Sequence, residues 1–151
     1  MRRRVAGLGV LIVLGAATPG RSQDNPSPVE MRQAGLKELG TAFKNLNDEL
    51  KKPEPLRVMV KYAVATIGRD AAQLGGWFPP GSGPGPGVKT HAKPEIWTNR
   101  AVFDTLNANF RKASGDLAAA NGTGDLGAVR TQAKTLGATC KACHEKFRVE
   151  D

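Results

Sequence analysis

Apolar residues recur at steps of three and four positions over four long stretches of this 151-residue chain. Such steps place them on one face of an α-helix, because a helical turn takes 3.6 residues. No stretch alternates apolar and polar residues as a half-buried β-strand does. The pattern therefore predicts an all-α chain. The four apolar faces are formed by Leu36, Leu39, Phe43, Leu46 and Leu50; by Leu56, Val60, Ala63, Ile67, Ala71 and Leu74; by Phe103, Leu106, Phe110, Ala113 and Leu117; and by Leu126, Val129, Ala133, Leu136, Cys140, Cys143 and Phe147.

Proline and glycine mark where these helices begin and end. The first helix is expected to end at Pro53 and Pro55, which also open the second. The second is expected to stop at Gly75–Gly76. Pro94 suits the first turn of the third helix, and residues 121–124 form the break before the fourth.

The segment between the second and third helices, residues 77–97, reads WFPPGSGPGPGVKTHAKPEIW. It is too rich in glycine and proline for regular structure, and a loop of this length in a compact domain is usually functional or mobile. Two short turns and this loop join the four helices, so consecutive helices run in opposite directions. The prediction is an antiparallel, up-down four-helix bundle with shallow left-handed packing.

The last helix carries the motif CKACH, Cys140 to His144. Two cysteines three positions apart, followed directly by a histidine, are the attachment pattern of a c-type haem. On a helix the two sulfurs lie about one turn apart, so each can take one vinyl-derived carbon of the same porphyrin. His144 lies on the same face as Cys140, where a ring nitrogen can reach the iron. We therefore expect the bundle to enclose one haem c, bonded to Cys140 and Cys143, with His144 as the metal ligand.

Three other roles of the cysteine pair fit the sequence less well. A thioredoxin-type redox pair belongs at the start of a helix in a βαβ unit, which this pattern lacks. A disulfide between residues three apart within one helix has poor geometry. A zinc site needs two further ligands, and the only other histidine of the chain is His91.

Half of the formal net charge of +8 comes from four arginines within residues 1–22. This segment has a charged start, an apolar run of about thirteen residues and small residues near Ser22, the three parts of a signal peptide. The run is shorter than the roughly twenty residues that span a bilayer, and no stop-transfer pattern follows, which disfavours the alternative of a membrane anchor. We expect cleavage after Ser22, a mature domain of residues 23–151 and no membrane attachment afterwards.

The charge that remains gives no reason to expect nucleic acid as a partner. No lysine- or arginine-rich run is left once residues 1–22 are removed, and aromatic residues make up only 5% of the chain. A nucleic-acid-binding surface needs a basic patch or stripe, often with aromatic residues for stacking. Half of the excess positive charge thus belongs to the export signal.

Three segments together match the sequence pattern of a known family. They are Arg32-Gln33 with Leu36, the loop from Phe78 through Thr90 to PEIW at residues 94–97, and CKACHEKFR at residues 140–148. With them the chain resembles the cytochrome c′ family, the class II c-type cytochromes, over essentially all of residues 23–151. The resemblance implies a periplasmic haem protein with its haem motif near the C-terminus of the bundle. Phe147 departs from the family, in which tyrosine is common here, and removes a hydroxyl near the haem.

The resemblance assigns roles on the proximal side of the haem. Cys140 and Cys143 correspond to the thioether anchors, and His144 corresponds to the proximal ligand. Arg148, one turn further on, corresponds to the cation that flanks the proximal imidazole.

It also assigns roles at the haem edge. Arg32 and Gln33 correspond to the pair that holds a propionate, since a guanidinium binds a carboxylate through two parallel hydrogen bonds. Thr90 and His91, just before the third helix, are weaker candidates for contacts at the same edge.

The residue that faces the iron from the first helix decides the coordination. Low-spin members of the family use a methionine there, whereas this chain has Leu36, which cannot coordinate iron. Met31 is roughly 140° around the helix from it, and Met59 belongs to the second helix. His91 lies in the loop, where a histidine is more often solvated. We therefore expect five-coordinate, high-spin iron with an apolar distal side.

An apolar distal side favours nitric oxide and carbon monoxide over dioxygen, whose bound form needs a hydrogen-bond donor. The resemblance implies a protein that binds these gases, carries electrons to or from an unknown redox partner, or does both. Two alternatives stay open: a low-spin, six-coordinate class II electron carrier, and a haem enzyme acting on nitric oxide or peroxide. A peroxidase needs a distal acid–base group. None is evident beside Leu36, so we expect no enzyme.

Members of the family commonly form homodimers through the first two helices. Val58, Tyr62 and Val64 are apolar positions on the second helix that we expect to face outward, which is compatible with a homodimer.

Overall fold

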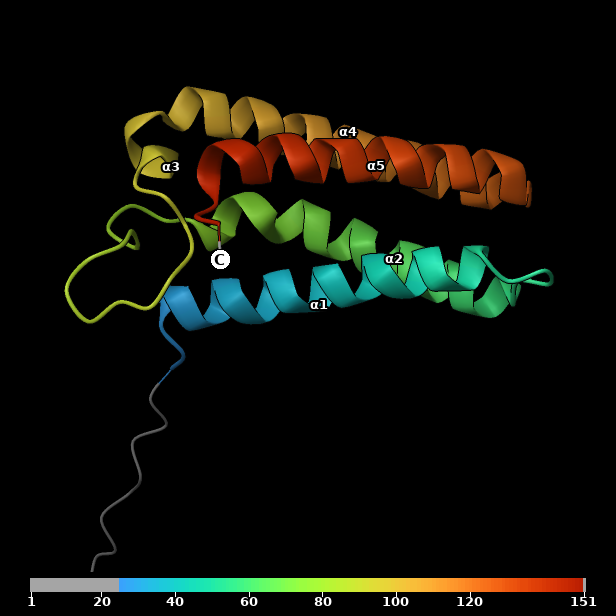
Figure 1. Cartoon of the computed structure of the whole chain (residues 1–151), viewed down its shortest axis with the longest axis horizontal. Helices are drawn as coiled ribbons and strands as arrows, with labels where there is room; N and C mark the ends of the chain where they lie inside the picture. Colours follow the sequence, from blue (N-terminus) through green and yellow to red (C-terminus); the bar gives the residue numbers. More distant parts are fainter. Residues whose placement is uncertain (1–24, 151) are drawn as a thin grey trace, which may run out of the picture.

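Four long helices lie side by side in the computed structural model, which describes residues 25–150 (Figure 1). They are α1 (Pro28–Leu50), α2 (Arg57–Gln73), α4 (Arg100–Thr123) and α5 (Leu126–Phe147). Each runs opposite to the one before it, with α1 packed on α2, α2 on α4 and α4 on α5. The predicted antiparallel four-helix bundle is confirmed. The predicted signal peptide, residues 1–22, lies outside the described residues.

The helix ends follow local rules of hydrogen bonding. Ser27 caps α1: its hydroxyl accepts from the Glu30 amide, and the Glu30 carboxylate accepts from the Ser27 amide. Asp125 caps α5 by accepting from the Gly127 amide. Gly124, with φ of 76°, ends α4 in the left-handed conformation that favours glycine.

Two helix boundaries differ from the prediction. The chain does not stop at Gly75 and Gly76 but continues beyond α2 as a 3₁₀ helix, η1 (Leu74–Trp77), which buries Leu74 and Trp77 in the core. The third helix is split into a short α3 (Glu95–Thr98) and α4, because Asn99 leaves the helical region with φ of −122° and ψ of 48°. One non-helical residue hardly changes the spacing of the apolar positions, and that spacing therefore predicted a single helix.

The side chains of the core come mainly from the four predicted apolar faces. Two residues of those faces lie outside the core because they line a cavity: Leu36 is 37% exposed and Cys140 is partly buried. Val64 is 4% exposed, so the prediction that it faces outward is wrong; it lies one turn after the buried Val60 on the same face of α2. Val58 and Tyr62 are exposed, as predicted.

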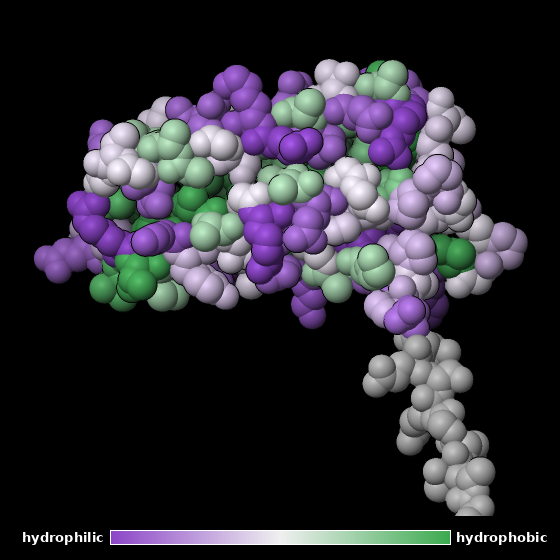
Figure 2. Space-filling view, turned by 180° about the vertical axis from the view of Figure 1, so that it is seen from behind, coloured by the Kyte–Doolittle hydropathy of each residue, from purple (hydrophilic) through white to green (hydrophobic). Residues whose placement is uncertain are grey.

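Four of the eight exposed large hydrophobic residues that the structure describes lie at the start of α2. Figure 2 shows hydrophobic side chains at the end of the molecule far from the grey segment. The exposed apolar residues at this end of α2 are Leu56, Val58, Met59 and Tyr62. None of the helices in residues 25–150 combines the length and the apolar composition that crossing a bilayer would require.

The long loop between η1 and α3 is tied to the bundle by hydrogen bonds. The Trp97 indole donates to the Pro79 carbonyl at 2.8 Å, and the Lys93 amide donates to the Phe147 carbonyl at 2.9 Å. Ala92 and Arg148 form an isolated antiparallel bridge, and the described residues contain no strand. The loop thereby closes one end of the bundle against α5 (Figure 1).

Candidate functional site

A cavity of about 450 Å³ opens at the end of the bundle where the long loop lies. Its walls come from α1, α4, α5 and the loop, and most of its lining is apolar. Three rings form an aromatic wall: Phe78 meets Phe103 with centroids 4.9 Å apart, and Phe103 meets Phe147 at 5.6 Å, both edge to face. The volume lies within the range of about 300–1,000 Å³ usual for small-molecule and cofactor sites.

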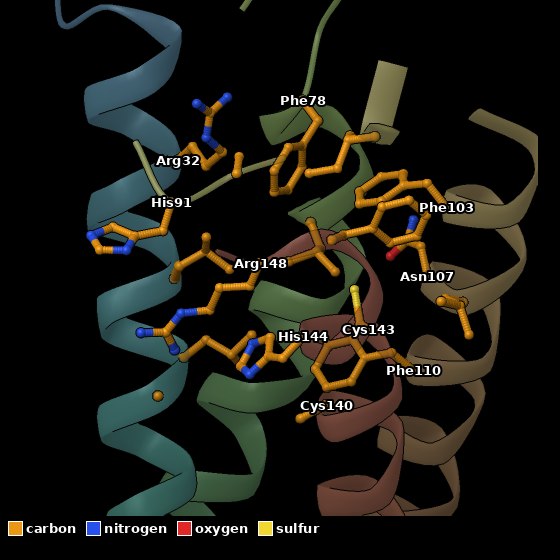
Figure 3. A pocket seen from close by; sticks show the side chains of 18 of the residues that line it. Arg32, Phe78, His91, Phe103, Asn107, Phe110, Cys140, Cys143, His144 and Arg148 are labelled. Carbon is orange, nitrogen blue, oxygen red and sulfur yellow. The ribbon is translucent and has the colours of Figure 1, made fainter. Parts of the chain in front are cut away.

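The haem-attachment motif lies on the α5 wall of this cavity. Cys140, Cys143 and His144 all line it, and the two cysteines are free thiols of intermediate burial. Figure 3 shows His144 and Arg148 projecting from α5 toward α1. One helical turn thus presents two sulfurs and an imidazole to a single apolar space.

The protonation of the thiols argues against a redox pair. Burial raises the pKa of Cys143 to about 11, with a smaller contribution from Cys140, and burial also raises the pKa of Cys140. Redox-active and nucleophilic cysteines have a lowered pKa, because the thiolate is the reactive form. Both thiols are therefore protonated at neutral pH.

His144 is a neutral imidazole at neutral pH. It lies at the cavity edge, where neighbouring protein atoms remove part of the ring from water and lower its pKa, and the positive charge of Arg148 lowers it further. A neutral imidazole offers a ring nitrogen to a metal ion. In the described residues, no group of three or more His, Cys, Asp or Glu side chains is placed to hold a metal ion.

The contact between Phe43 and Gly137 sets the level of α1 against α5. A Cβ built on Gly137 would lie 3.2 Å from the Phe43 ring, so the glycine lets the ring pack closely. The two helices run in opposite directions, and each residue advances either one by about 1.5 Å. Counting back along α1 and forward along α5 from this contact, we expect Leu36 near the level of His144 and Arg32 near that of Arg148; all four residues line the cavity.

Arg32 is a buried cation that holds the loop on α1. Its side chain is 1% exposed and donates to the Ser82 carbonyl at 3.0 Å, the Ser82 hydroxyl at 3.2 Å and the Thr90 hydroxyl at 3.1 Å. Its guanidinium also lies 5.1 Å from the ring centroid of Phe78 and 5.6 Å from that of Trp97. Burial lowers its pKa. No carboxylate of residues 25–150 forms an ion pair with it.

The other predicted edge residues lie around the same mouth of the cavity. Gln33 donates from its side-chain nitrogen to the Lys89 carbonyl at 2.8 Å, which also ties the loop to α1. Thr90 accepts from Arg32 and from the Ala92 amide. His91 is exposed and lines the cavity, and its carbonyl accepts from the Val149 amide. The structure thus brings all nine predicted site residues to one cavity: Arg32, Gln33, Leu36, Thr90, His91, Cys140, Cys143, His144 and Arg148.

Some lining residues were not singled out from the sequence. Lys37 lines the cavity next to Leu36. Asn107 also lines it, and among the described lining residues its side-chain oxygen is the only buried one without a hydrogen-bond partner. Neither lies on a predicted apolar face, so periodicity gave no signal for them. Met31 and Met59 do not line the cavity and are 50% and 45% exposed.

Known proteins of one family match almost the whole described chain. A family model described as Cytochrome C' matches residues 27–148. Cytochrome c-556 of Agrobacterium tumefaciens (strain B2A) is 36% identical over 125 residues, which covers 81% of this chain and 97% of that protein. Cytochrome c' of Rhodopseudomonas palustris is 32% identical over 152 residues, which covers 99% of both.

Solved structures agree with these matches. Cytochrome c' from Thermochromatium tepidum is 32% identical with a TM-score of 0.75, over 83% of this chain and 98% of that one. A ferrous variant of cytochrome c' from Alcaligenes xylosoxidans with bound nitric oxide is 29% identical with a TM-score of 0.74, over 82% and 94%. A further neighbour, with a TM-score of 0.75 and 32% identity over 83% and 99%, is a cytochrome c' with ligand-controlled dimer dissociation.

Proposed function

Because this chain belongs to the cytochrome c′ family, we propose that it is a periplasmic haem protein whose five-coordinate iron binds nitric oxide and carbon monoxide, carries electrons, or does both. One observation supports this most directly: His144 on α5 and Leu36 on α1 line the same cavity. An imidazole can ligate iron from one side, whereas a leucine cannot ligate it from the other.

The family implies haem c, and the cavity fits it. Cys140 and Cys143 would hold the ring through thioether bonds, since their sulfurs lie one helical turn apart on the cavity wall. When bound, the haem supplies an iron that exchanges one electron and takes a diatomic gas. His144 would ligate that iron through its neutral imidazole, and Arg148 would flank it. The aromatic wall around Phe103 would keep water from the ring.

Arg32 supports the proposal through its charge. A buried cation is costly unless an anion accompanies it, and the described residues provide no carboxylate for it. Its guanidinium retains N–H groups beyond those given to Ser82 and Thr90. We infer that a haem propionate at the cavity mouth supplies the counter-charge, with Gln33, Thr90 and His91 beside it.

The side chains on the α1 side of the cavity favour nitric oxide and carbon monoxide over dioxygen as ligands. The apolar α1 side chains that line the cavity are Leu36, Leu39 and Phe43, and none of them donates a hydrogen bond; Lys37, which also lines it, is exposed, and Gln33 donates to the loop. Bound dioxygen is stabilised by such a donor, whereas nitric oxide and carbon monoxide bind without one. The same lack of an acid–base group disfavours a peroxidase, and the outward position of Met31 disfavours a low-spin carrier with methionine as sixth ligand.

Location and assembly belong to the same proposal. Residues 1–22 would direct export and be removed, which leaves residues 23–151 as the bundle in the periplasm. Two copies would pair through α1 and α2, where Val58 and Tyr62 are 69% and 71% exposed. The solved relative with ligand-controlled dimer dissociation makes a dimer a reasonable state to test.

Haem staining and gas titration test the function together. Protein exported to the periplasm is denatured, separated by electrophoresis and stained for haem; the proposal expects stain that survives denaturation and disappears in a variant with both Cys140→Ala and Cys143→Ala. Nitric oxide is then added to the native ferrous protein while its Soret band is followed. Protein that retains no haem, or a Soret band that does not respond to nitric oxide, would contradict the proposal.

A further inference from the structure

The charged side chains that line the cavity all carry the same sign. They are Arg32, Lys37 and Arg148, and no aspartate or glutamate of residues 25–150 lines it. Arg32 is buried, whereas Lys37 and Arg148 are exposed at the mouth. Figure 3 shows Arg148 reaching from α5 toward α1, the helix that carries Lys37. The mouth of the cavity is therefore positively charged from two sides.

The long loop adds a lysine to the same opening. Lys89 is exposed, and its carbonyl accepts at 2.8 Å from the side chain of Gln33, which lines the cavity. Five lysines of residues 25–150 are held in ion pairs, but Lys37 and Lys89 are not among them. Their ammonium groups therefore face solvent with their charge intact.

The carboxylates that lie close to these cations in the sequence are Glu30, Glu38, Glu145 and Glu150. Glu30 caps α1, and Glu38 pairs with Arg69 of α2 at 2.6 Å. Glu145 pairs with Lys141 at 3.6 Å. None of the four carboxylates lines the cavity. The opening thus keeps an excess of positive charge.

We propose that Lys37, Lys89 and Arg148 form a cationic rim that docks an acidic face of the protein with which the haem exchanges electrons. The inference rests on the proposed function, because a redox partner has a reason to reach this mouth only when a haem lies behind it. Arg32 is matched with one haem propionate, so the three rim cations face at most one more. The remaining positive charge would speed the encounter with an acidic surface and orient it. These charges lie at the surface, so the docking requires no free space inside the cavity.

The substitution Lys37→Glu tests the rim by reversing one charge. Ferricyanide, an anion, takes one electron from the ferrous haem and becomes ferrocyanide, and stopped-flow absorption follows this reaction. For a probe about 10 Å from the altered charge, Coulomb's law predicts a rate constant about tenfold lower at low salt and about twofold lower near 0.5 M salt. A fluorescein-labelled peptide of about ten glutamates, followed by fluorescence anisotropy, is expected to bind more weakly with the same dependence on salt.

Lys134→Glu is the matched control. Lys134 is also exposed and outside the lysine ion pairs, but it lies on the part of α5 before the cysteines and does not line the cavity. Both variants change the net charge equally, so an effect of total charge would appear in both. Lys134→Glu is expected to stay within about twofold of the unsubstituted protein, whereas Lys89→Glu should resemble Lys37→Glu.

A cationic probe separates docking from a change in reduction potential. Hexaammineruthenium(II) gives one electron to the ferric haem, and its reaction is expected to be faster in Lys37→Glu, because the repulsion from the rim is smaller. Added negative charge beside the haem would lower its reduction potential. A lower potential would favour oxidation by ferricyanide and oppose this reduction, so it would shift both rates in the opposite direction.

Each remaining outcome separates the rim from the proposed function. Equal rates and equal peptide affinity in Lys37→Glu and Lys134→Glu would overturn the rim and leave the haem function standing. Binding to phosphatidylglycerol vesicles that requires Lys37, without binding of the glutamate peptide, would also overturn it, since the occupant would be an anionic membrane surface. An unsubstituted protein that holds no haem, or whose haem reacts with neither redox probe, would instead overturn the proposed electron carrier.

Discussion

Replacing Arg32 with alanine is expected to release the long loop and destabilise the folded protein. The side chain is 1% exposed and donates three hydrogen bonds of 3.0–3.2 Å, two to Ser82 and one to Thr90. It also lies over the rings of Phe78 and Trp97. Alanine removes all of these contacts at once and leaves a space in the wall of the cavity.

The change in the free energy of unfolding depends on two terms: the contacts that alanine removes, and the cost of burying the guanidinium, which alanine also removes. A hydrogen bond from a charged donor contributes about 1.5–3 kcal/mol, and a cation–π contact about 0.5–2 kcal/mol. The substitution also removes the cost of desolvating the guanidinium, the cost that lowers the pKa of Arg32, so the net loss is smaller than the sum. We expect the free energy of unfolding to fall by about 1–3 kcal/mol, the cost of leaving a buried acceptor such as the Ser82 carbonyl without its hydrogen bond.

Urea unfolding and limited trypsin digestion measure the two effects. Trypsin cleaves after Lys89, next to the Thr90 hydroxyl that Arg32 holds, so Arg32→Ala is expected to be cut there faster. Arg32→Lys keeps the charge but not the planar fork and should give an intermediate result. Arg111→Ala, at an exposed position of α4, is the control and should stay within about 0.5 kcal/mol. Unchanged unfolding and unchanged cleavage in Arg32→Ala would refute the reasoning.

Three further predictions test other parts of the account. Leu36→Met is expected to convert the absorption spectrum from high-spin to low-spin, because a thioether sulfur at this level can ligate iron; an unchanged spectrum would contradict the placement of residue 36. In haem-free protein, a Cys143 pKa of about 11 leaves roughly 0.1% thiolate at pH 8. Alkylation by iodoacetamide should therefore accelerate about tenfold per pH unit up to pH 10. A rate that does not change with pH would contradict the burial of this thiol. Gly35→Ala would place a Cβ 2.5 Å from the Trp77 ring and should cost about 1–3 kcal/mol in urea unfolding, whereas Gly115→Ala should stabilise; equal effects would contradict the packing.

The helices were predictable because their signal is local and repeated. An apolar residue every three or four positions identifies a buried face, as at Phe103 and Phe110, whatever the rest of the chain does. The break at Asn99 was missed because one non-helical residue hardly alters that spacing. Val64 was misplaced although it lies one turn after the buried Val60, a spacing that puts both on the face of α2 that packs in the core.

The site was predictable to the extent that its residues lie close together in the sequence. Cys140 and His144 form a local motif, so their common wall followed from helix geometry. The loop bonds of Arg32 reach residues 50 and 58 positions away, and no local pattern indicates such partners.

Resonance Raman spectroscopy of the ferrous, exported protein reports how many ligands the iron has. If His144 holds the iron and Leu36 faces it from α1, the marker bands of a five-coordinate, high-spin haem are expected before any gas is added. Bands of a six-coordinate, low-spin haem would mean that a second side chain reaches the iron and would contradict the account.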